Sequence, residues 1–200
     1  MARSIVVIKY NAGNIRSVLC TLNRLGLDAE VTSDASRIRN ASRVIFPGVG
    51  EASTAMRHLI ASGLDELMAS LTQPFLGICL GMQLMCRFSE EHDTKCLGIF
   101  DLPVVRFPSS SLKVPHMGWN RLKQIDQETC RLLTETGWAY FVHSYYVPLC
   151  EHSVALCTYG DITFSAALSR DNFTGFQFHP EKSGKYGMAM LERFIGQGEL

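Results

Sequence analysis

Residues 74–83 constrain the fold of this chain more than any other stretch. A short apolar segment, of the length of a buried strand, ends in Gly-Ile-Cys-Leu-Gly, and residues 82–86 continue with a pattern typical of a helix. Cys79 then lies at the apex of a sharp turn between the strand and the helix. Such a turn brings the two backbones too close together for side chains, which explains the glycines at positions 77 and 81. The stretch therefore predicts a strand, a turn and a helix, with a thiol at the turn.

A thiol at such a turn can react in ways that a core cysteine cannot. It faces the positive end of the helix dipole, which favours the thiolate over the thiol. The amide of Leu80, the next residue, points to where an oxyanion forms when a carbonyl is attacked. The alternative is a buried core cysteine between two packing glycines, and the pentapeptide by itself does not decide between the two interpretations.

Length and charge limit the possible functions. The chain has 200 residues, which fits a single domain over residues 1–200. Its 19 basic residues balance 19 acidic ones, which excludes a strong electrostatic attraction to nucleic acid or to an anionic membrane. No apolar run approaches the length of a membrane span, and the first residues lead straight into a strand-like segment. We therefore expect a cytoplasmic protein whose ligand is a small molecule or whose partner is a protein.

Cysteine and histidine usage argues against a disulfide framework and against a metal centre. The seven cysteines form no C-x-x-C pair, and their odd number suits reduced thiols. The six histidines are scattered, and none lies in a metal-like cluster with cysteine or with another histidine. We therefore expect neither a metal nor another cofactor.

The first half of the chain alternates strands and helices. Residues 4–8 form a continuous β-branched run, typical of a parallel strand that is buried on both faces. Apolar residues then recur at helical spacing between positions 15 and 25, and Gly26 can end that helix. Further strands are expected at 27–32, at 44–46 and before Cys79, and helices at 51–61 and 64–71. This alternation predicts an α/β fold, with an open, mostly parallel, flavodoxin-like sheet, helices on both faces, and ligands at the carboxyl ends of the strands.

The second half reads as short strands. Alternating polar and apolar residues, separated by Gly, Pro and Asp, predict antiparallel strands that are added to the sheet. The expected strands are 104–107, 122–125, 139–146, 153–158, 162–168 and 173–178, and a last helix is expected at 185–195.

A histidine and a glutamate lie close together near the end of the chain. If strand geometry continues to this point, His179 and Glu181 project to the same side, with Pro180 stiffening the backbone between them. A thiol, a histidine and an orienting carboxylate are the parts of an activated nucleophile. Each of these residues alone is more often structural. Cys79, His179 and Glu181 together, each at the end of a predicted strand, favour a catalytic site.

Three motifs resemble the signatures of class I glutamine amidotransferases, and they stand in the order of that family. They are Pro-Gly-Val-Gly at 47–50, the cysteine motif at 77–83, and Gln-Phe-His-Pro-Glu at 177–181. Further blocks are similar to those of one branch of the family, the glutaminase subunits of imidazole glycerol phosphate synthases. These blocks are Tyr-Asn-Ala-Gly-Asn at 10–14, Pro-His-Met-Gly-Trp-Asn at 115–120 and Tyr-Phe-Val-His-Ser-Tyr-Tyr at 140–146. The resemblance covers the chain nearly end to end.

The resemblance implies hydrolysis of glutamine to glutamate and ammonia. It makes Cys79 the nucleophile, His179 the proton shuttle and Glu181 the residue that orients the histidine. The two oxyanion donors are then the amides of Leu80 and Val49, the latter if its peptide turns inward. The implied substrate-binding residues are Gly48, Gly50, Gln83, Ser144 and Tyr145, the last two through backbone groups.

The resemblance also implies a partner. In that branch the ammonia passes to a (β/α)₈-barrel cyclase subunit, which makes imidazole glycerol phosphate in histidine biosynthesis. The residues that the resemblance assigns to the partner surface are Asn11, Asn14, Trp119, Tyr140 and Lys182. Three alternatives stay open: a paralogous glutaminase that feeds another synthase, a catalytically silent regulatory subunit, and a Cys-His-Glu peptidase of related fold.

Overall fold

The first apolar run forms β1 (Ile5–Ile8), which is buried along its whole length. Its neighbours β2 (Glu30–Thr32) and β3 (Arg43–Gly48) both run parallel to it. Beyond β3, β4 (Phe75–Cys79) and then β14 (Phe173–Phe176) continue the parallel arrangement. The structure is a computed structural model that describes residues 4–11, 13–109, 112–125, 132–133 and 137–196.

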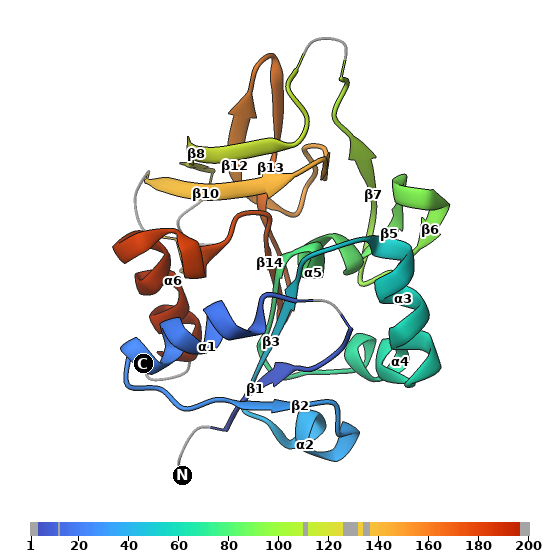
Figure 1. Ribbon diagram of the computed structural model, residues 1–200, viewed down its shortest axis with the longest axis vertical. Coiled ribbons are helices and arrows are strands. Elements are labelled where there is room, and N and C mark those ends of the chain that lie inside the picture. Colours follow the sequence, from blue (N-terminus) through green and yellow to red (C-terminus); the bar gives the residue numbers. More distant parts are fainter. Residues whose placement is uncertain (1–3, 12, 110–111, 126–131, 134–136, 197–200) are drawn as a thin grey trace.

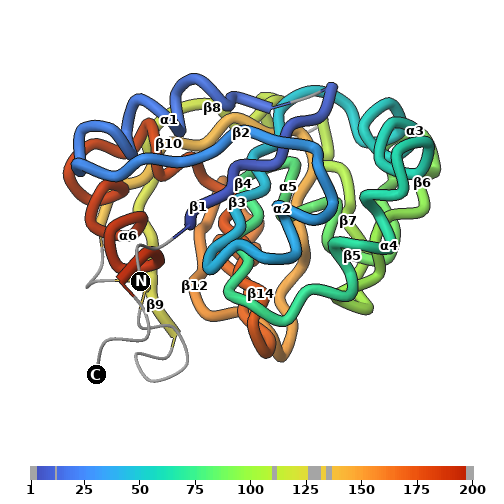
Figure 2. Tube along the Cα trace, turned by 90° about the horizontal axis from the view of Figure 1, so that it is seen from below, coloured from blue at the N-terminus to red at the C-terminus, as the bar shows by residue number. Residues whose placement is uncertain are grey.

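Helices cover both faces of these parallel strands, as predicted (Figure 1). They are α1 (Ile15–Arg24), α2 (Ala35–Asn40), α3 (Ala52–Ala61), α4 (Leu64–Ala69) and α6 (Gly184–Gly196). Because strand side chains alternate between faces, Val7 belongs to one buried cluster with residues of α1 and α6, and Val6 to another with residues of α2, α3 and α4. Figure 2 shows α1 and α6 on one side of the strands, and α3 and α4 on the other. No helix in the described part of the chain is long and apolar enough to cross a membrane.

Antiparallel strands extend the sheet beyond β14, as the second half of the sequence predicted. β13 (Ile162–Arg170) pairs with β14, β12 (Ser153–Tyr159) pairs with β13, and β9 (Lys123–Gln124) pairs with β12, all antiparallel. The full order is β2-β1-β3-β4-β14-β13-β12-β9. The predicted fold class, an open and mostly parallel α/β sheet with added antiparallel strands, is confirmed.

β14 differs from the prediction, because it runs parallel to β4 instead of being antiparallel throughout. A tight turn at Asp171, whose φ is 52°, reverses the chain between β13 and β14. The next residue, Asn172, accepts a hydrogen bond from the amide of Phe75 and donates its side-chain amide to the carbonyls of Leu71 and Gln73, at 3.0 and 2.9 Å. β14 therefore begins at the same end of the sheet as β4 and must run alongside it.

Two smaller sheets were not predicted as separate units. One contains β11 (Tyr145–Tyr146), β7 (Phe100–Arg106), β5 (Cys86–Ser89) and β6 (Thr94–Lys95), and the other pairs β8 (His116–Arg121) with β10 (Trp138–His143). The strand expected at 139–146 is therefore split between two sheets, with the break at Ser144. β8 overlaps the block at 115–120, which the sequence analysis interpreted only as a motif. In Figure 1, β8 and β10 cross the end of the main sheet above β14 and α6.

The helix after the cysteine, α5, covers Leu80–Leu84 and not the expected 82–86. It begins directly after Cys79, so the turn is sharper than the pattern indicated. It ends early because Cys86 opens β5, whose pairing with β7 takes up the backbone groups of the following residues.

Candidate active site

Cys79 occupies the turn that the sequence predicted. It ends β4 and has φ 54° and ψ −110°, outside the regions that residues with a side chain normally adopt. Strain of this kind persists only where the surrounding structure enforces it. A Cβ at Gly81 would overlap a backbone carbonyl of β3, and one at Gly77 would lie 2.9 Å from the backbone of Gly81. The two glycines therefore let β3, β4 and α5 close around the cysteine.

His179 and Glu181 are brought together, but by a helical turn instead of by strand geometry. His179 lies on extended backbone after β14, and Glu181 lies in the short 3₁₀ helix η2 (Pro180–Lys182). The Nδ1 atom of His179 lies 2.8 Å from Oε1 of Glu181, and each side chain is only 1% exposed. Pro180 suits the first position of such a turn, because its missing N–H would have had no helical partner there.

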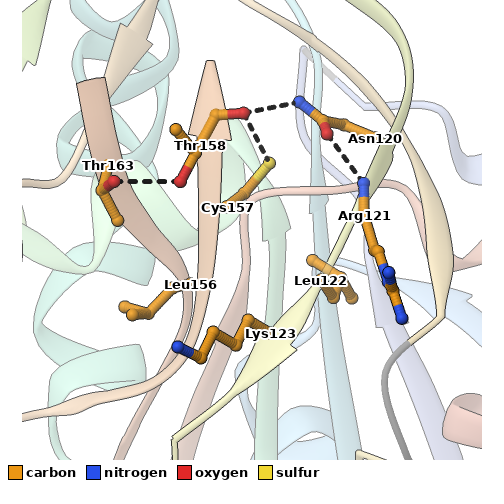
Figure 3. A pocket seen from close by; sticks show the side chains of 8 residues that line it. All are labelled: Asn120, Arg121, Leu122, Lys123, Leu156, Cys157, Thr158 and Thr163. Atoms are coloured by element: carbon orange, nitrogen blue, oxygen red, sulfur yellow. Dashed lines mark hydrogen bonds between the residues drawn. The ribbon is translucent and has the colours of Figure 1, made fainter. Parts of the chain in front are cut away.

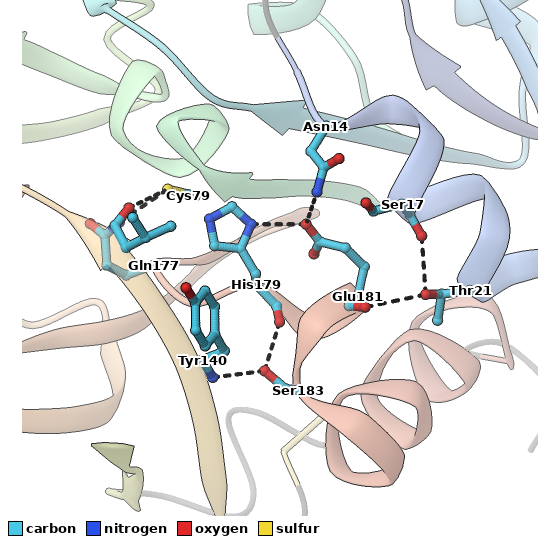
Figure 4. A network of polar contacts seen from close by, with 10 residues as sticks. Asn14, Ser17, Thr21, Cys79, Tyr140, Gln177, His179, Glu181 and Ser183 are labelled. Atoms are coloured by element: carbon cyan, nitrogen blue, oxygen red, sulfur yellow. Dashed lines mark hydrogen bonds and ion pairs between the residues drawn. The ribbon is translucent and has the colours of Figure 1, made fainter. Parts of the chain in front are cut away.

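Further hydrogen bonds hold this pair in place (Figure 4). The side-chain amide of Asn14 donates to Oε1 of Glu181 at 3.2 Å, and the hydroxyl of Thr21 donates to the Glu181 backbone carbonyl at 3.4 Å. The hydroxyl of Ser183 donates to the carbonyl of His179 at 2.6 Å and accepts from the amide of Tyr140 at 3.0 Å. The pair is thus tied to α1 and to β10.

The electrostatics favour a charged imidazole. Burial lowers the pKa of His179, but the neighbouring Cys79 sulfur and the Glu181 carboxylate outweigh burial, and the net shift is upward. The second ring nitrogen, Nε2, is buried and has no hydrogen-bond partner within the described residues. Figure 4 shows the ring between Glu181 and Cys79. The arrangement therefore stabilises an imidazolium at His179 beside the Cys79 sulfur.

A cavity of about 290 Å³ opens in front of Cys79. This volume lies at the small end of ligand pockets and suits a small metabolite. The lining residues are Val49, Gly50, Cys79, Leu80, Gln83, Glu91, Pro115, Val142, His143, Ser144 and Tyr145. Most of the predicted oxyanion and substrate-binding residues are therefore gathered at one cavity.

Gly48 differs from the other predicted substrate-binding residues, because it is not among those that line the cavity. A Cβ at Gly48 would lie 2.7 Å from the Cβ of Leu80, so this glycine packs against the turn at Cys79. Its small size serves the close approach of β3 to α5, and the cavity wall comes from Val49 and Gly50 beyond it.

Tyr10, Asn11 and Asn14, which belong to one of the motifs, make different contacts. The Tyr10 hydroxyl is buried and donates to the carbonyl of Pro47 at 2.9 Å, which anchors the start of the glycine-rich loop. Asn11, expected at the partner surface, is exposed and donates to the carbonyl of Thr54 at 3.3 Å. Asn14, also expected there, directs its side chain to Glu181.

Glu91 is a cavity residue that the sequence analysis missed. It lies in the 3₁₀ helix η1 (Glu91–Asp93), and its Oε2 accepts the amide of Ala52 at the start of α3 at 2.7 Å. Burial raises its pKa. Residues 87–95 show no helical or strand periodicity that would have placed this carboxylate at the cavity.

Exposed aromatic residues lie near the site on β8 and β10. Trp119 is 54% exposed and packs edge-on against Tyr140, with the ring centroids 6.1 Å apart. The Nζ atom of Lys182 lies 5.7 Å from the centroid of the Tyr140 ring, a cation–π distance. Met117 and Trp138 are also exposed on this ribbon, at 62% and 58%. Together they form an apolar surface of the kind that marks protein contacts.

A second and larger cavity, about 550 Å³, lies between β8–β9 and β12–β13 (Figure 3). None of the predicted site residues lines it. Its thiol, Cys157, is not an activated nucleophile, because burial raises its pKa to about 12. Among the residues that the structure describes, no group of three or more His, Cys, Asp or Glu side chains could hold a metal ion.

Two buried histidines adjoin the site. The Nδ1 atom of His143 lies 2.7 Å from the carbonyl oxygen of Tyr145, and its Nε2 lies 3.0 Å from Nδ1 of His116. Because a carbonyl can only accept, His143 carries its proton on Nδ1 and accepts from His116 at Nε2. Burial lowers the pKa of His143 to about 3 and that of His116 to about 4, so both rings are neutral in the folded chain.

This pair makes stability depend on pH. As pH falls below about 6.5, the unfolded chain protonates both rings, whereas the folded chain does not until about pH 4. The stabilisation is therefore present above pH 6.5 and is lost towards pH 4, by up to about 1.4 kcal/mol per pH unit for each ring. Well below pH 6.5, His179 contributes no further change, because both states then hold its proton. Urea unfolding of wild type and His143→Gln at pH 7, 6 and 5 tests this, and equal losses in both proteins would contradict it.

The sequence and the fold match known proteins of one family. The sequence pattern of the family described as glutamine amidotransferase class-I matches residues 6–197. A solved structure described as PurLQS from Thermotoga maritima superposes with a TM-score of 0.74 at 16% identity, covering 98% of this chain and 99% of that one. Another, described as a glutamine amidotransferase, has a TM-score of 0.73 at 18% identity and covers 96% of each chain. The chain belongs to the class I glutamine amidotransferase family.

Closer relatives narrow the assignment. The imidazole glycerol phosphate synthase subunit HisH of Bacteroides thetaiotaomicron is 54% identical over 193 residues, which cover 96% of this chain and 98% of that protein. The HisH subunit of Haemophilus influenzae is 44% identical over 195 residues, covering 96% of each. Within the family, the chain therefore groups with the HisH subunits of imidazole glycerol phosphate synthase, and it is an enzyme.

Proposed function

We propose that this enzyme hydrolyses glutamine to glutamate and ammonia at Cys79, His179 and Glu181, and that it passes the ammonia to a cyclase subunit. The observation that carries the proposal is the buried pair of His179 and Glu181, 2.8 Å apart, beside a strained cysteine at the wall of a small cavity. The names of the relatives support a role inside a synthase that has more than one subunit.

The reaction follows the double-displacement scheme of an activated nucleophile. The Cys79 thiolate attacks the side-chain amide carbon of glutamine, forming a C–S bond and moving the carbonyl electrons onto oxygen. His179 gives its Nε2 proton to the nitrogen, which leaves as ammonia as the carbonyl reforms in a thioester. His179 then takes a proton from water, which attacks the thioester, and the departing sulfur regains its electron pair. Throughout the reaction the Nδ1 proton stays on His179 and is donated in a hydrogen bond to Glu181.

The oxyanion requires donors that point at its position. We assign this role to the backbone amides of Leu80, at the start of α5, and of Val49. Both residues line the cavity beside Cys79. Gly50 follows Val49 with φ at 107°, a conformation that favours glycine and gives the loop its turn.

The other end of glutamine carries an ammonium and a carboxylate. Glu91 is the carboxylate in the cavity wall, so we assign it to the ammonium group. The carbonyls of Ser144 and Tyr145 already accept hydrogen bonds within the protein, from Phe107 and from His143. We therefore assign their amides, and not their carbonyls, to the substrate carboxylate. Gln83 completes this wall.

Activity should depend on the cyclase subunit. Ammonia released without an acceptor is protonated in water and is lost. Slow glutamine hydrolysis until the cyclase has bound its nucleotide would avoid this loss. A rotation of the Gly48–Val49 peptide would add or remove one oxyanion donor, which changes rates by roughly 10²–10³. We expect slow glutamate release by the isolated chain and faster release with the cyclase and its nucleotide. Three equal rates would contradict this regulation, and no glutamate under any of these conditions would contradict the proposed function.

The exposed surface around Trp119, Tyr140 and Lys182 is the proposed contact with the cyclase. Lys182→Ala removes the ammonium from the Tyr140 ring, and a cation–π contact of this kind contributes about 0.5–1 kcal/mol. We expect binding to the cyclase to weaken roughly two- to fivefold, measured by calorimetry, while a glutamine-mimicking electrophile still labels Cys79 at the wild-type rate. The control is Lys185→Ala, an exposed lysine in α6. Wild-type affinity in Lys182→Ala would remove this residue from the interface.

A further inference from the structure

A series of hydrogen bonds through two buried glutamine side chains connects the cavity wall to the Cys79 sulfur. Gln177, which follows β14, is fully buried, and its Nε2 lies 3.8 Å from the sulfur of Cys79. Its Oε1 lies 2.9 Å from Nε2 of Gln83 in α5. That same Nε2 atom of Gln83 lies 2.9 Å from the backbone carbonyl of Tyr145. Both glutamine side chains are buried, so these hydrogen bonds satisfy polar groups that water cannot reach.

The direction of each hydrogen bond in this series follows from the group at its first end, the backbone carbonyl of Tyr145. The Tyr145 carbonyl can only accept, so the Gln83 atom that faces it must be the nitrogen. This nitrogen donates to Gln177, so the Gln177 atom that faces it must be the oxygen. The remaining Gln177 group, its N–H, is thereby directed at the sulfur of Cys79.

The backbone makes this placement rigid. The amide of Gln177 donates to the carbonyl of Ala166 in β13 at 2.9 Å, and the amide of His179 donates to the carbonyl of Tyr140 at 2.9 Å. The same short segment after β14 therefore places both Gln177 and His179 around one sulfur atom. The Tyr145 carbonyl is also held by His143.

The two protonation states of the sulfur have different partners. The carbonyl of Val142 lies 3.8 Å from the Cys79 sulfur and can accept only from a thiol. The Gln177 N–H can donate only to a lone pair, and it gains most when the sulfur is negative, because charge-assisted hydrogen bonds are the stronger ones. Unlike an imidazolium, an amide keeps its donor at every pH in the working range.

We propose that Gln177 is a further catalytic residue, which donates its side-chain N–H to the Cys79 thiolate and is oriented for this by Gln83. The inference rests on the proposed function, in which Cys79 is the nucleophile. The N–H stabilises the thiolate before attack on glutamine. It does so again when the C–S bond of the thioester breaks and the electron pair returns to sulfur.

The test measures the thiolate directly, in the whole chain and without glutamine. Alkylation of Cys79 by iodoacetamide is followed by peptide mass spectrometry across pH, for wild type, Gln177→Glu and Gln177→Met. Gln177→Glu keeps an oxygen for Gln83 but turns an acceptor towards the sulfur, whereas Gln177→Met removes the donor without adding charge. The exposed thiol of Cys20 is alkylated in the same samples and serves as an internal reference.

We expect the midpoint pH of Cys79 alkylation to rise by about one unit or more in Gln177→Met, and further in Gln177→Glu. A hydrogen bond to a charged group changes an ionisation constant by roughly tenfold or more. Glutamine kcat should fall by a similar factor, with little change in KM. Asn172→Asp, an amide-to-acid change at the other end of β14, should leave the midpoint unchanged.

An unchanged midpoint in a folded Gln177→Met would overturn the proposal, and if Gln177→Glu does not fold, Gln177→Met decides. The result stays distinct from the proposed function, because the alkylation midpoint can be measured even in a chain that releases no glutamate. Normal alkylation with no glutamine turnover in wild type would count against the function alone.

Discussion

Cys79→Ala is expected to abolish glutamine-dependent synthesis by the assembled complex while leaving ammonia-dependent synthesis intact. In the proposed mechanism the Cys79 sulfur forms the thioester, and Cys79 is the only cysteine among the residues that line the cavity. If the proposed cyclase subunit takes only ammonia from this enzyme, ammonium salts at raised pH should restore product formation. Glutamate release and cyclase product are measured in the same samples.

A matched thiol control is available inside the chain. Cys157→Ala removes a buried thiol that does not line the cavity at Cys79, and burial keeps the pKa of that thiol at about 12. This variant should retain glutaminase activity. Because residues that act as one unit lose activity non-additively, adding His179→Ala to Cys79→Ala should cost little more. Glutamine turnover by Cys79→Ala at the wild-type rate would exclude the thiol as the nucleophile.

Glu181→Gln is expected to reduce glutaminase kcat by a factor on the order of 10²–10⁴ with the fold intact. A neutral amide cannot stabilise the imidazolium, and it can present its own N–H to Nδ1 of His179, which favours the wrong tautomer. The substitution keeps the size of the side chain. It also leaves the backbone carbonyl that accepts from Thr21. Steady-state kinetics with saturating glutamine provide the measurement.

Two variants calibrate that loss. Asn14→Ala removes the amide that donates to Oε1 of Glu181 at 3.2 Å, and it should cost less than Glu181→Gln because the carboxylate itself remains. Glu151→Gln changes an exposed carboxylate and should have no effect. A kcat of Glu181→Gln within twofold of wild type would remove Glu181 from the mechanism.

The parallel half of the fold could be predicted because its signals are local. The continuous β-branched run of β1 has one interpretation, a strand buried on both faces, and the spacing of Val18 and Leu22 places one face of α1 on the core. The two glycines around Cys79 indicate a sharp turn, because only such a turn brings the backbones too close for side chains. The approach of His179 and Glu181 was predicted correctly, although η2 and not strand geometry produces it.

The rest depends on contacts between distant residues. The parallel direction of β14 follows from the anchoring of Asn172 beside the start of β4, which no pattern within residues 173–178 encodes. The break at Ser144 follows from the pairing of β11 with β7 instead of with β8. Glu91 reaches the cavity only because the small sheet places η1 there. A sequence pattern describes a residue's neighbours along the chain, whereas these positions are decided by neighbours in space.

Asn14 and Gln177 each make a contact at the site that the family resemblance did not predict. Asn14 was assigned to the partner surface, yet its side chain bonds to Glu181. Gln177 was quoted only as part of a motif, yet its amide faces the sulfur of Cys79. Both are polar contacts of buried or half-buried amides with residues far away in the sequence. Such contacts have no periodicity, so composition and spacing do not reveal them.

The central claim is that glutamine is hydrolysed through a covalent bond to Cys79. Its most direct test is rapid acid quench of the enzyme during turnover with glutamine, in the presence of the cyclase subunit, followed by peptide mass spectrometry. We predict a γ-glutamyl thioester on the peptide that contains Cys79, at a level that falls as glutamine is exhausted. Steady glutamate release with no adduct on that peptide, or with the adduct on another cysteine, would contradict the account.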